Sequence, residues 1–544
     1  MSLDPDRTPV VVAVGQAESR DLALGPLELA EAAARQALDA SPRLAGAIER
    51  VTLVNVLSRR AGVAPAGALC EALDLRGRPR ETTSIGGNTP QAMVERAAGD
   101  IAGGRLGATL IVGAEAVRSG RLRSAAAVEE KKAPPSAGAT ASAAGAERAR
   151  EPDVVVGTDR QDLSDEERLA GLYIPLHVYP MFESVLAARA GRTPAQQREV
   201  IGRLLAPFTE VAAANPHAWF RQVRSAADLA TVSPDNRLVA EPYLKTMVAF
   251  LGGAQAAAVV VTSLAVARAL RLDDGCLFVW SAASANEVWF PMARPDLGGA
   301  PALEAAASAA LGAAGIGVDD VSAFDLYSCF PSAVQIAAAS LGLRLDLDHP
   351  EEMRPITVTG GLPYFGGPGN NYSTHAVAAM FDLFRSSTGL SGAGNGPRLG
   401  LITGVGWYLT KHSVGVYGSA PPPQGYAPVD TSTAQALIDA SALPFVAAGE
   451  EVAAEGTVDA STVIYDRDGR PTAAPVVATL QDGRRVVAAA SPRGAEDAAG
   501  TFLVGARIRV EGAAGAAVAP AYSVVEAPLS PSVPASAATA SPAT

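Results

Sequence analysis

The chain has 544 residues and a formal net charge of −12; 48% of its residues are hydrophobic and 18% are charged. This length exceeds what one hydrophobic core serves and indicates several domains. The negative charge argues against a nucleic-acid partner and against an anionic membrane surface. Three cysteines are too few for a disulfide framework or a zinc site, and no apolar run is long enough for a membrane span. We therefore expect a cytoplasmic protein without a metal.

The first 123 residues alternate between short apolar runs and amphipathic runs, which predicts an α/β fold with a parallel sheet and helices on both faces. The expected strands are 10–14, 51–56, 81–85 and 108–114, and the expected helices are 26–40, 65–73 and 89–102. The same order returns in residues 276–418, with strands at 277–282, 323–328, 355–359, 399–404 and 413–417 and helices at 302–314, 332–341 and 373–384. The repetition predicts an internal duplication, with 1–123 and 276–418 as two similar halves.

The other segments differ in composition. Residues 124–275 separate the two halves: the low-complexity stretch 124–150 predicts a flexible linker, and the helix-rich part that follows it predicts a loop domain. After the proline run that ends at Pro423, short strands alternate with Asp-Gly turns, so we predict a small all-β, OB-like domain at 424–515. The Ala-, Ser- and Pro-rich residues 516–544 predict a disordered tail.

Three strand-to-helix turns carry unusual sequences. They are TTSIGGNTPQAM at 82–93, FDLYSCFPS at 324–332, and TVTGGLPYFGGPGNNYSTH at 357–375. A helix that begins after such a turn directs free backbone N–H groups at one point, which favours an anion there. Because ligands gather at the carboxyl ends of strands in α/β sheets, we expect one residue from each turn to approach a common pocket. The three residues are Gly86, Cys329 and Gly367.

The chain resembles a thiolase of the sterol-carrier-protein-type branch over about residues 8–418. The resemblance rests on the duplicated halves, on the loop domain between them, on Asn215-Pro216-His217-Ala218, and on the stretch FLGGAQAA at 250–257. The added β domain makes the chain similar to thiolase-like proteins of type 1. This resemblance implies a duplicated α/β/α/β/α core, a coenzyme A thioester as substrate or ligand, and a monomer or homodimer.

The catalytic positions depart from that family. Aligned on the first turn, the nucleophilic cysteine of thiolases corresponds to Gly86, and the histidine of the Gly-His-Pro motif corresponds to Gly367. The branch has His-Asp-Cys-Phe on the second turn, where this chain has Tyr327-Ser328-Cys329-Phe330. Thiolase chemistry by the usual route through an acyl-enzyme is therefore not expected.

Several residues remain as candidates for chemistry. The resemblance implies an acid/base role for Cys329, and the Tyr327 phenol has a hydroxyl that can give or take a proton. His375, in the third turn's helix, and His412, before the last strand, have the reach to contribute. For each of these residues a purely structural role in the core stays open. The resemblance also implies that turn groups hold the thioester oxygen, and the candidates are Gly86, Gly87, Asn88, Gly367 and Asn370.

Three functions follow, and the sequence leaves all three open. The first is retro-aldol cleavage of a β-hydroxyacyl-CoA, which needs a base and an oxyanion hole but no acyl-enzyme. In that reading the fused β domain takes the part of the OB-type partner of thiolase-fold retro-aldolases. The second is an acetyl-CoA acetyltransferase whose nucleophile is displaced to Ser84 or Cys329. The third is a non-catalytic acyl-CoA binder or scaffold.

Overall fold

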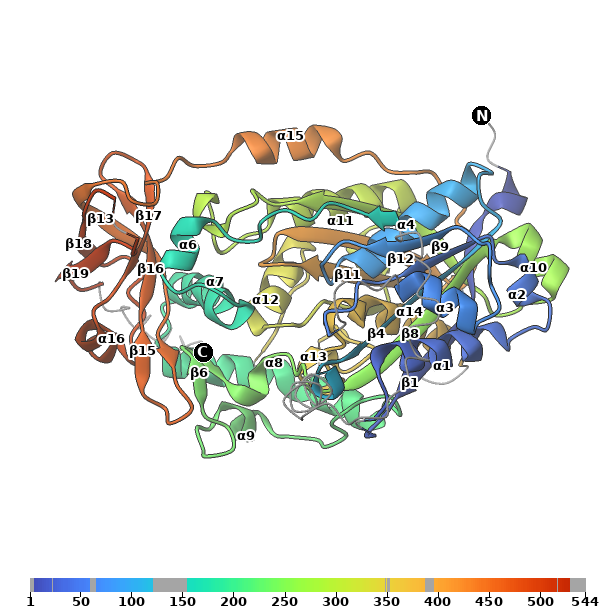
Figure 1. The fold of residues 1–544 in the computed structure, drawn as a ribbon, viewed down its shortest axis with the longest axis horizontal. Helices are drawn as coiled ribbons and strands as arrows, with labels where there is room; N and C mark the ends of the chain where they lie inside the picture. Colours follow the sequence, from blue (N-terminus) through green and yellow to red (C-terminus); the bar gives the residue numbers. More distant parts are fainter. Residues whose placement is uncertain are drawn as a thin grey trace, which may run out of the picture.

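The computed structural model of the chain describes residues 4–21, 23–58, 65–120, 154–347, 349, 353–386, 396–515 and 517–528. Figure 1 shows a large α/β core with a small β barrel beside it, and helix α15 (Ser432–Ala440) runs along the outside between the two. Within these residues, no helix is both long and apolar enough to cross a membrane.

The N-terminal half contributes five strands in the order β1-β8-β4-β2-β3. Strand β8 is antiparallel to β1 and β4, whereas β4, β2 and β3 are parallel to one another. The strands are β1 (Pro9–Glu18), β2 (Arg50–Leu53), β3 (Arg80–Thr83), β4 (Ala108–Ala116) and β8 (Ala254–Ser263). The helices between them are α1 (Pro26–Leu38), α3 (Pro65–Ala72) and α4 (Thr89–Ala102).

The C-terminal half repeats this arrangement, in the order β9-β12-β11-β10. Its second strand in space, β12, is again antiparallel to both neighbours, and β11 and β10 are again parallel. These four strands match β1, β8, β4 and β2 of the first half in order and direction, which confirms a duplicated core. The predicted bounds differ, because β8 (254–263) lies outside 1–123 and β3 has no counterpart in this half. The elements are β9 (Leu277–Asn286), α11 (Pro301–Ala314), β10 (Ala323–Asp325), α12 (Pro331–Ser340), α14 (Tyr372–Arg385), β11 (Leu399–Gly406) and β12 (Lys411–Gly418).

Two helices lie between the half-sheets. Both α4 and α14 contact strands of each half, including β8 of the first half and β11 of the second, whereas α1 contacts only β1, β4 and β8 among the strands, and α11 contacts β9 and β12. This places helices outside, sheets next and helices at the centre, which is the predicted α/β/α/β/α layering. The half-sheets join through a short pairing of β1 with β9, Val10 opposite Phe278 and Val11 opposite Leu277.

Two details of the sheets differ from prediction. The half-sheets are mixed rather than parallel, since only four residues join β11 to β12, and so short a connection forces an antiparallel pair. The strand predicted at 355–359 does not form. The buried Asp325 carboxylate accepts the backbone N–H groups of Val358 and Thr359 (3.0 and 3.2 Å), so these groups are not available for a strand ladder.

The segment between the halves forms a loop domain of helices α6 (Asp165–Leu169), α7 (Pro175–Arg189), α8 (Pro194–Ala214) and α9 (Ala226–Ala230) and short strands β6 (Leu238–Ala240) and β7 (Tyr243–Leu244). Before it, β5 (Val154–Val156) pairs in parallel with the outer edge of β3. The linker predicted at 124–150 lies outside the described residues.

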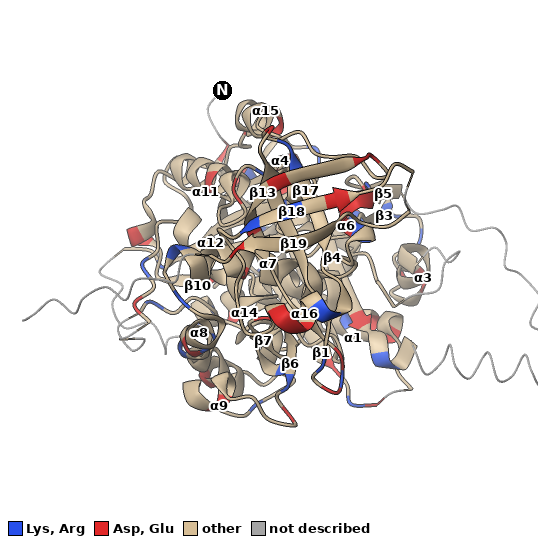
Figure 2. Cartoon of the chain, turned by 90° about the vertical axis from the view of Figure 1, so that its left-hand side faces the viewer, with Lys and Arg blue, Asp and Glu red and all other residues tan. Residues whose placement is uncertain are grey.

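The C-terminal region is a closed five-stranded barrel in the order β13-β16-β17-β19-β18, as predicted for a small all-β, OB-like fold. Its strands are β13 (Val452–Ser461), β16 (Pro475–Leu480), β17 (Arg485–Ala489), β18 (Arg507–Gly512) and β19 (Ala521–Glu526), and helix α16 (Pro492–Ala498) precedes β18. It encloses its own apolar cluster, which includes Val458, Val476 and Ile508. Figure 2, which looks onto the barrel, shows acidic and basic residues together on its strands.

The barrel extends beyond its predicted end. Strand β19 closes it, so the disordered tail predicted from residue 516 is wrong for Ala521–Glu526. Short strands β14 (Ile464–Tyr465) and β15 (Pro471–Ala473) leave the barrel and share a four-stranded sheet with β6 and β7 of the loop domain. The exact domain boundaries stay a prediction.

Candidate active site

The first turn connects β3 to α4 and requires glycine. Gly86 has a φ of +148°, and a Cβ placed on it would overlap the Oδ1 of Asn88. Its N–H donates to the Asn370 Oδ1 at 3.0 Å, so the first and third turns are joined directly. This bond also corrects a prediction, because the Gly86 N–H is not available to a thioester oxygen. Within the described part of the chain, the N–H groups of Gly87 and Asn88 have no partner.

The second turn places the Tyr327 phenol on the first turn. A Cβ on Gly87 would overlap the Tyr327 hydroxyl, so the ring occupies the space that a first-turn side chain would need. The Tyr327 backbone N–H is held by the Thr403 hydroxyl (2.8 Å), but among the described residues its own hydroxyl has no hydrogen-bond partner. Burial raises the pKa of Tyr327, so its hydroxyl stays protonated and can donate to a ligand.

Cys329 lies near Tyr327 and is only partly buried. Its surroundings raise the pKa of the thiol to about 12, chiefly through loss of water, so it is not a thiolate at neutral pH. The hydroxyl of Tyr179, on α7, hydrogen-bonds to Cys329 and also donates to the Trp407 carbonyl at 2.9 Å. Tyr179 was not predicted from the sequence; it is 150 residues away from Cys329 and its helix belongs to the loop domain.

Polar groups of the third turn form hydrogen bonds with other parts of the chain. A Cβ on Gly366 (φ +120°) would overlap the Gln255 Oε1, and the Gly367 N–H donates to the Phe250 carbonyl at 2.8 Å. The Asn370 side chain uses both ends, because its Nδ2 donates to the Asn55 carbonyl at 2.8 Å. In the structure both residues hold the turns together, and the oxygen-binding roles predicted for Gly367 and Asn370 stay a prediction.

The two candidate histidines are buried in the core. The His375 Nδ1 lies 2.8 Å from the Gln16 Oε1, and its ring packs edge-on against Phe365 at 5.0 Å between ring centres. The His412 Nε2 lies 3.0 Å from the Leu409 carbonyl oxygen. Burial lowers the pKa of each to about 3, so both are neutral. Among the described residues neither histidine is hydrogen-bonded to Tyr327, and their catalytic roles stay a prediction.

Lys411, the neighbour of His412, reaches the first turn instead. Its Nζ donates to the carbonyl of Ile85, the residue before Gly86, at 2.6 Å. The side chain is buried, and its ammonium lies 5.9 and 5.8 Å from the ring centres of Trp289 and Trp407. Sequence reasoning missed this residue because lysines are almost always exposed; its only signal was its place one residue before His412.

A groove of about 1000 Å³ opens on the loop-domain side of the third turn. Phe250, whose carbonyl holds the Gly367 N–H, is part of its wall. The Tyr364 hydroxyl in the wall is buried and has no hydrogen-bond partner among the residues that the structure describes. The charged and aromatic residues of the wall are Arg118, Arg221, Arg224, Lys245, Asp235, Trp219, Phe220, Phe250 and Tyr364. Four cations against one carboxylate make the groove positive on a chain of net charge −12.

Comparison with known proteins agrees with this architecture. Residues 435–516 match the family described as the thiolase-like protein type 1 additional C-terminal domain. The chain is similar to a monomeric SCP2-thiolase-like protein type 1 from Mycobacterium smegmatis, with 29% identity and a TM-score of 0.76 over 96% of this chain and all of that one. No curated protein sequence matches the chain at a significant level.

More distant structures share the fold of the core. An aldolase titled Ltp2-ChsH2(DUF35) is 16% identical, with a TM-score of 0.54 over 77% of this chain and 99% of that one. The dimeric peroxisomal thiolase of Saccharomyces cerevisiae is 14% identical, with a TM-score of 0.52 over 76% of this chain and 98% of that one. Residues 435–516 thus match the additional C-terminal domain of thiolase-like proteins of type 1, and the chain as a whole is similar in fold and length to one such protein.

Proposed function

We propose that this chain binds acyl-CoA thioesters and acts on them without forming an acyl-enzyme. The observation that carries the proposal is the Tyr327 phenol lying on Gly87, the residue after Gly86, which corresponds by alignment to the nucleophile of thiolases and has no side chain here. A ligand that reaches this point meets a neutral hydroxyl and two free N–H groups, which are donors for a thioester oxygen, and no nucleophile.

The groove supports coenzyme A as the handle of the substrate. Coenzyme A combines three phosphate groups with a flat adenine, and the groove combines four cations with aromatic side chains. The unpartnered Tyr364 hydroxyl lies in the same wall as Arg224, so a phosphate there would satisfy both groups. Because Phe250 joins the groove to the third turn, the acyl end would point toward the three turns.

Retro-aldol cleavage is the reaction that suits these groups best. A base removes the proton of the β-hydroxyl, the bond between the α and β carbons breaks, and a carbonyl product leaves. The electron pair stays on the shortened thioester as an enolate, which Tyr327 can stabilise and protonate. The aldolase with a similar fold and the fused barrel support this choice, with residues 1–123 and 276–418 as the catalytic halves and 424–515 as an added domain.

A displaced nucleophile is less well supported. The Ser84 hydroxyl is covered by Gly157, on which a Cβ would overlap it, and the Cys329 thiol has a pKa of about 12. A non-catalytic binder is the second candidate, because neither Tyr327 nor Cys329 is ionised near neutral pH and so neither is a ready base. The outer edge of β3 is covered by the chain's own β5, which supports a monomer.

Incubation with acetyl-CoA, a long-chain acyl-CoA and a β-hydroxyacyl-CoA tests the proposal. Calorimetry reports binding, intact-protein mass reports acylation, and chromatography of the products reports cleavage. We expect binding of all three, no mass increase, and cleavage of the β-hydroxyacyl-CoA alone. Arg224→Gln should weaken binding about tenfold or more, as expected for a lost charge-assisted contact, while the exposed Arg268→Gln should not. A stable acyl adduct would overturn the proposal, and binding without cleavage would favour the binder.

A further inference from the structure

Lys411 has a position that the proposed reaction does not yet use. It begins β12 in the C-terminal half, yet its ammonium bonds to the first turn of the N-terminal half, 326 residues away in the sequence. We propose that Lys411 is a positioning residue that fixes the first turn and gives it a positive charge, so that the turn favours an anionic acyl group. This inference rests on the proposed binding of CoA thioesters and extends it to the charge of the acyl end.

The lysine stem fits between two glycines. Its Cε lies 3.4 Å from the place of a Cβ on Gly86, and its Cβ lies 3.2 Å from the place of a Cβ on Gly406. The stem therefore determines how closely the β11–β12 hairpin approaches the first turn. Because the Nζ donates to the carbonyl of Ile85, the same side chain also orients the peptide that leads into Gly86.

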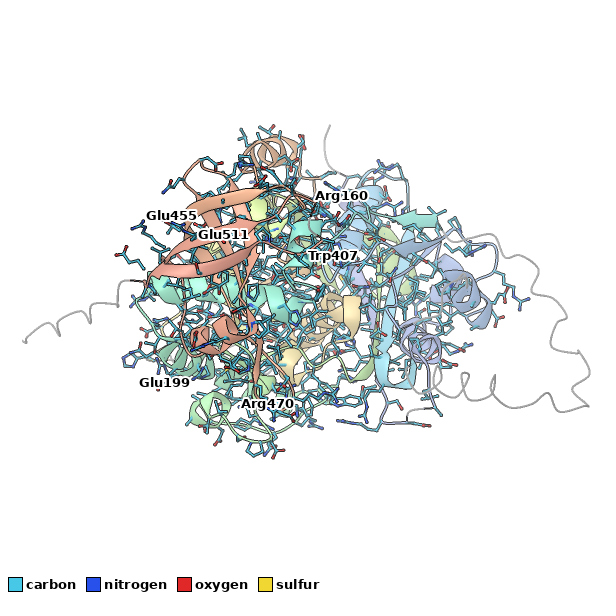
Figure 3. The ribbon with its side chains drawn as sticks, turned by 60° about the vertical axis from the view of Figure 1, so that its left-hand side comes forward. Arg160, Glu199, Trp407, Glu455, Arg470 and Glu511 are labelled. Carbon is cyan, nitrogen blue, oxygen red and sulfur yellow. The ribbon has the colours of Figure 1, made fainter. Side chains whose placement is uncertain are left out.

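The ammonium is kept away from water. Lys411 is 6% exposed, and its charge faces the rings of Trp289 and Trp407 at 5.9 and 5.8 Å. Figure 3 labels Trp407 and Arg160 in the part of the core next to the barrel. Its hydrogen bonds within the described chain are to two carbonyls, of Ile85 and Thr158. The Asp159 carboxylate, which accepts the Ile85 N–H at 2.8 Å, acts on the Lys411 charge but is not hydrogen-bonded to it within the described chain. A buried charge without a bonded counter-ion is costly and is typical of functional sites.

Two further groups at this place lack partners. The Asn88 side chain is 8% exposed, and its Oδ1, directed at the same point on Gly86, accepts no hydrogen bond from the described residues. The Trp407 indole N–H is likewise buried and unpartnered, and Trp407 has a φ of +56°. Buried polar groups are nearly always satisfied, and strained residues gather at functional sites. The Trp407 N–H is a donor that an anionic ligand oxygen can satisfy, whereas the Asn88 Oδ1 is an acceptor and needs a donor group of the ligand.

The chemistry of the reaction supplies such an atom. When a carbon–carbon bond next to a thioester breaks, the electron pair moves onto the thioester oxygen as an enolate. The start of α4, with the free N–H groups of Gly87 and Asn88, already favours negative charge. The Lys411 ammonium, which is bonded to the Ile85 carbonyl just before Gly86, adds to this positive potential without touching the reacting carbon.

Two stable thioethers of coenzyme A test the inference without turnover. Carboxymethyl-CoA ends in a carboxylate, and acetonyl-CoA ends in a neutral ketone of nearly the same shape. The ratio of their dissociation constants reports the preference for negative charge and is independent of how well the groove holds coenzyme A. We expect wild type to favour carboxymethyl-CoA by about tenfold, the size of one charge-assisted interaction.

Variants then assign the preference to Lys411. Lys411→Met and Lys411→Gln should bring the ratio near one, Lys411→Arg should restore most of it, and Arg160→Gln should leave it unchanged. Arg160 is the matched control because it is an exposed cation over the same Trp289 ring, at 4.4 Å. If Lys411→Met does not fold, the wild-type ratio and Lys411→Gln decide. Equal affinities in wild type, or a wild-type ratio in both uncharged variants, would refute the inference and leave acyl-CoA binding standing. If neither thioether binds, the proposed function fails too.

Discussion

The phenol of Tyr327 lies directly on the backbone of Gly87, so that the hydroxyl fills the place where a Cβ at residue 87 would be. This contact joins the second strand-end turn, in the C-terminal half, to the first turn, in the N-terminal half. It explains why residue 87 has no side chain of its own: the side chain at this place comes from the other half of the duplicated fold.

Gly87→Ala should therefore destabilise the protein by about 1–3 kcal/mol, because the Tyr327 ring is buried and has no room to withdraw. Urea unfolding measures the loss. The double variant Gly87→Ala/Tyr327→Ala is the control, since removing the ring removes the overlap with Tyr327 and leaves only the one with the Val405 carbonyl oxygen. We expect it to cost less than the sum of the single changes. Additive costs would mean that the two residues do not press on each other.

Tyr327→Phe deletes one hydroxyl and keeps the ring in place. Since this hydroxyl has no partner among the described residues, the free energy of unfolding should change by less than about 0.5 kcal/mol. If the hydroxyl stabilises or protonates an enolate, cleavage of a β-hydroxyacyl-CoA should fall about a hundred- to ten-thousand-fold while acyl-CoA binding persists. Steady-state kinetics and calorimetry on the same samples check both halves. Full activity in the Phe variant would make Tyr327 a packing residue.

The sequence predicted the framework better than the site. Helix α4 was placed correctly at both ends, since its Asn-Thr-Pro start and its apolar period are local signals. Strand β8 was not placed in the predicted sheet, and the direction of β12 was missed because it depends on where each strand enters the sheet. The strand expected at 355–359 does not form, because its N–H groups donate to the side chain of Asp325, thirty residues earlier.

At the site, the sequence identified the turns but not what each group does. Gly86, Gly367 and Asn370 look alike as candidates for oxygen binding, yet the structure pairs Gly86 with Asn370 and Gly367 with Phe250. Such pairings join residues more than a hundred positions apart and leave no local pattern. Lys411 was overlooked for the same reason, because only the fold brings it to Ile85.

The barrel should depend on one arginine for its attachment to the core. Arg485, on β17, is 4% exposed, lies 3.0 Å from an Asp459 carboxylate oxygen, and donates to the Pro295 carbonyl of the core at 3.2 Å. Arg485→Met leaves the Asp459 carboxylate and the Pro295 carbonyl without their partner, and should lower the free energy of unfolding by about 3 kcal/mol. Calorimetry should then show the barrel melting before the core.

The control for this change is Arg507→Met. Arg507 pairs with Glu455 at 2.7 Å on the outside of the barrel, where Figure 3 labels Glu455, and its side chain is 51% exposed. A solvated ion pair contributes little, so this variant should lose no more than about 1 kcal/mol. Equal losses in the two variants would show that Arg485 does not join the barrel to the core.

His375 should make the protein sensitive to mild acid. Burial lowers its pKa from an ordinary 6.5 to about 3 in the folded state. Below pH 6.5 the His375 imidazole is protonated in the unfolded chain but stays neutral in the folded one. The free energy of unfolding therefore falls as the pH drops from 6.5 toward 3. The slope is up to about 1.4 kcal/mol per pH unit for one such histidine.

Urea unfolding of wild type and His375→Gln at pH 6.5 and 4.5 isolates this contribution from the carboxyl groups, which both proteins share. Wild type should lose about 2 kcal/mol more than the variant over this interval, and His349→Gln, at an exposed position, should behave as wild type. A variant that loses as much as wild type would mean that His375 takes up its proton in the folded protein, and that the bond from its Nδ1 to Gln16 does not keep it neutral.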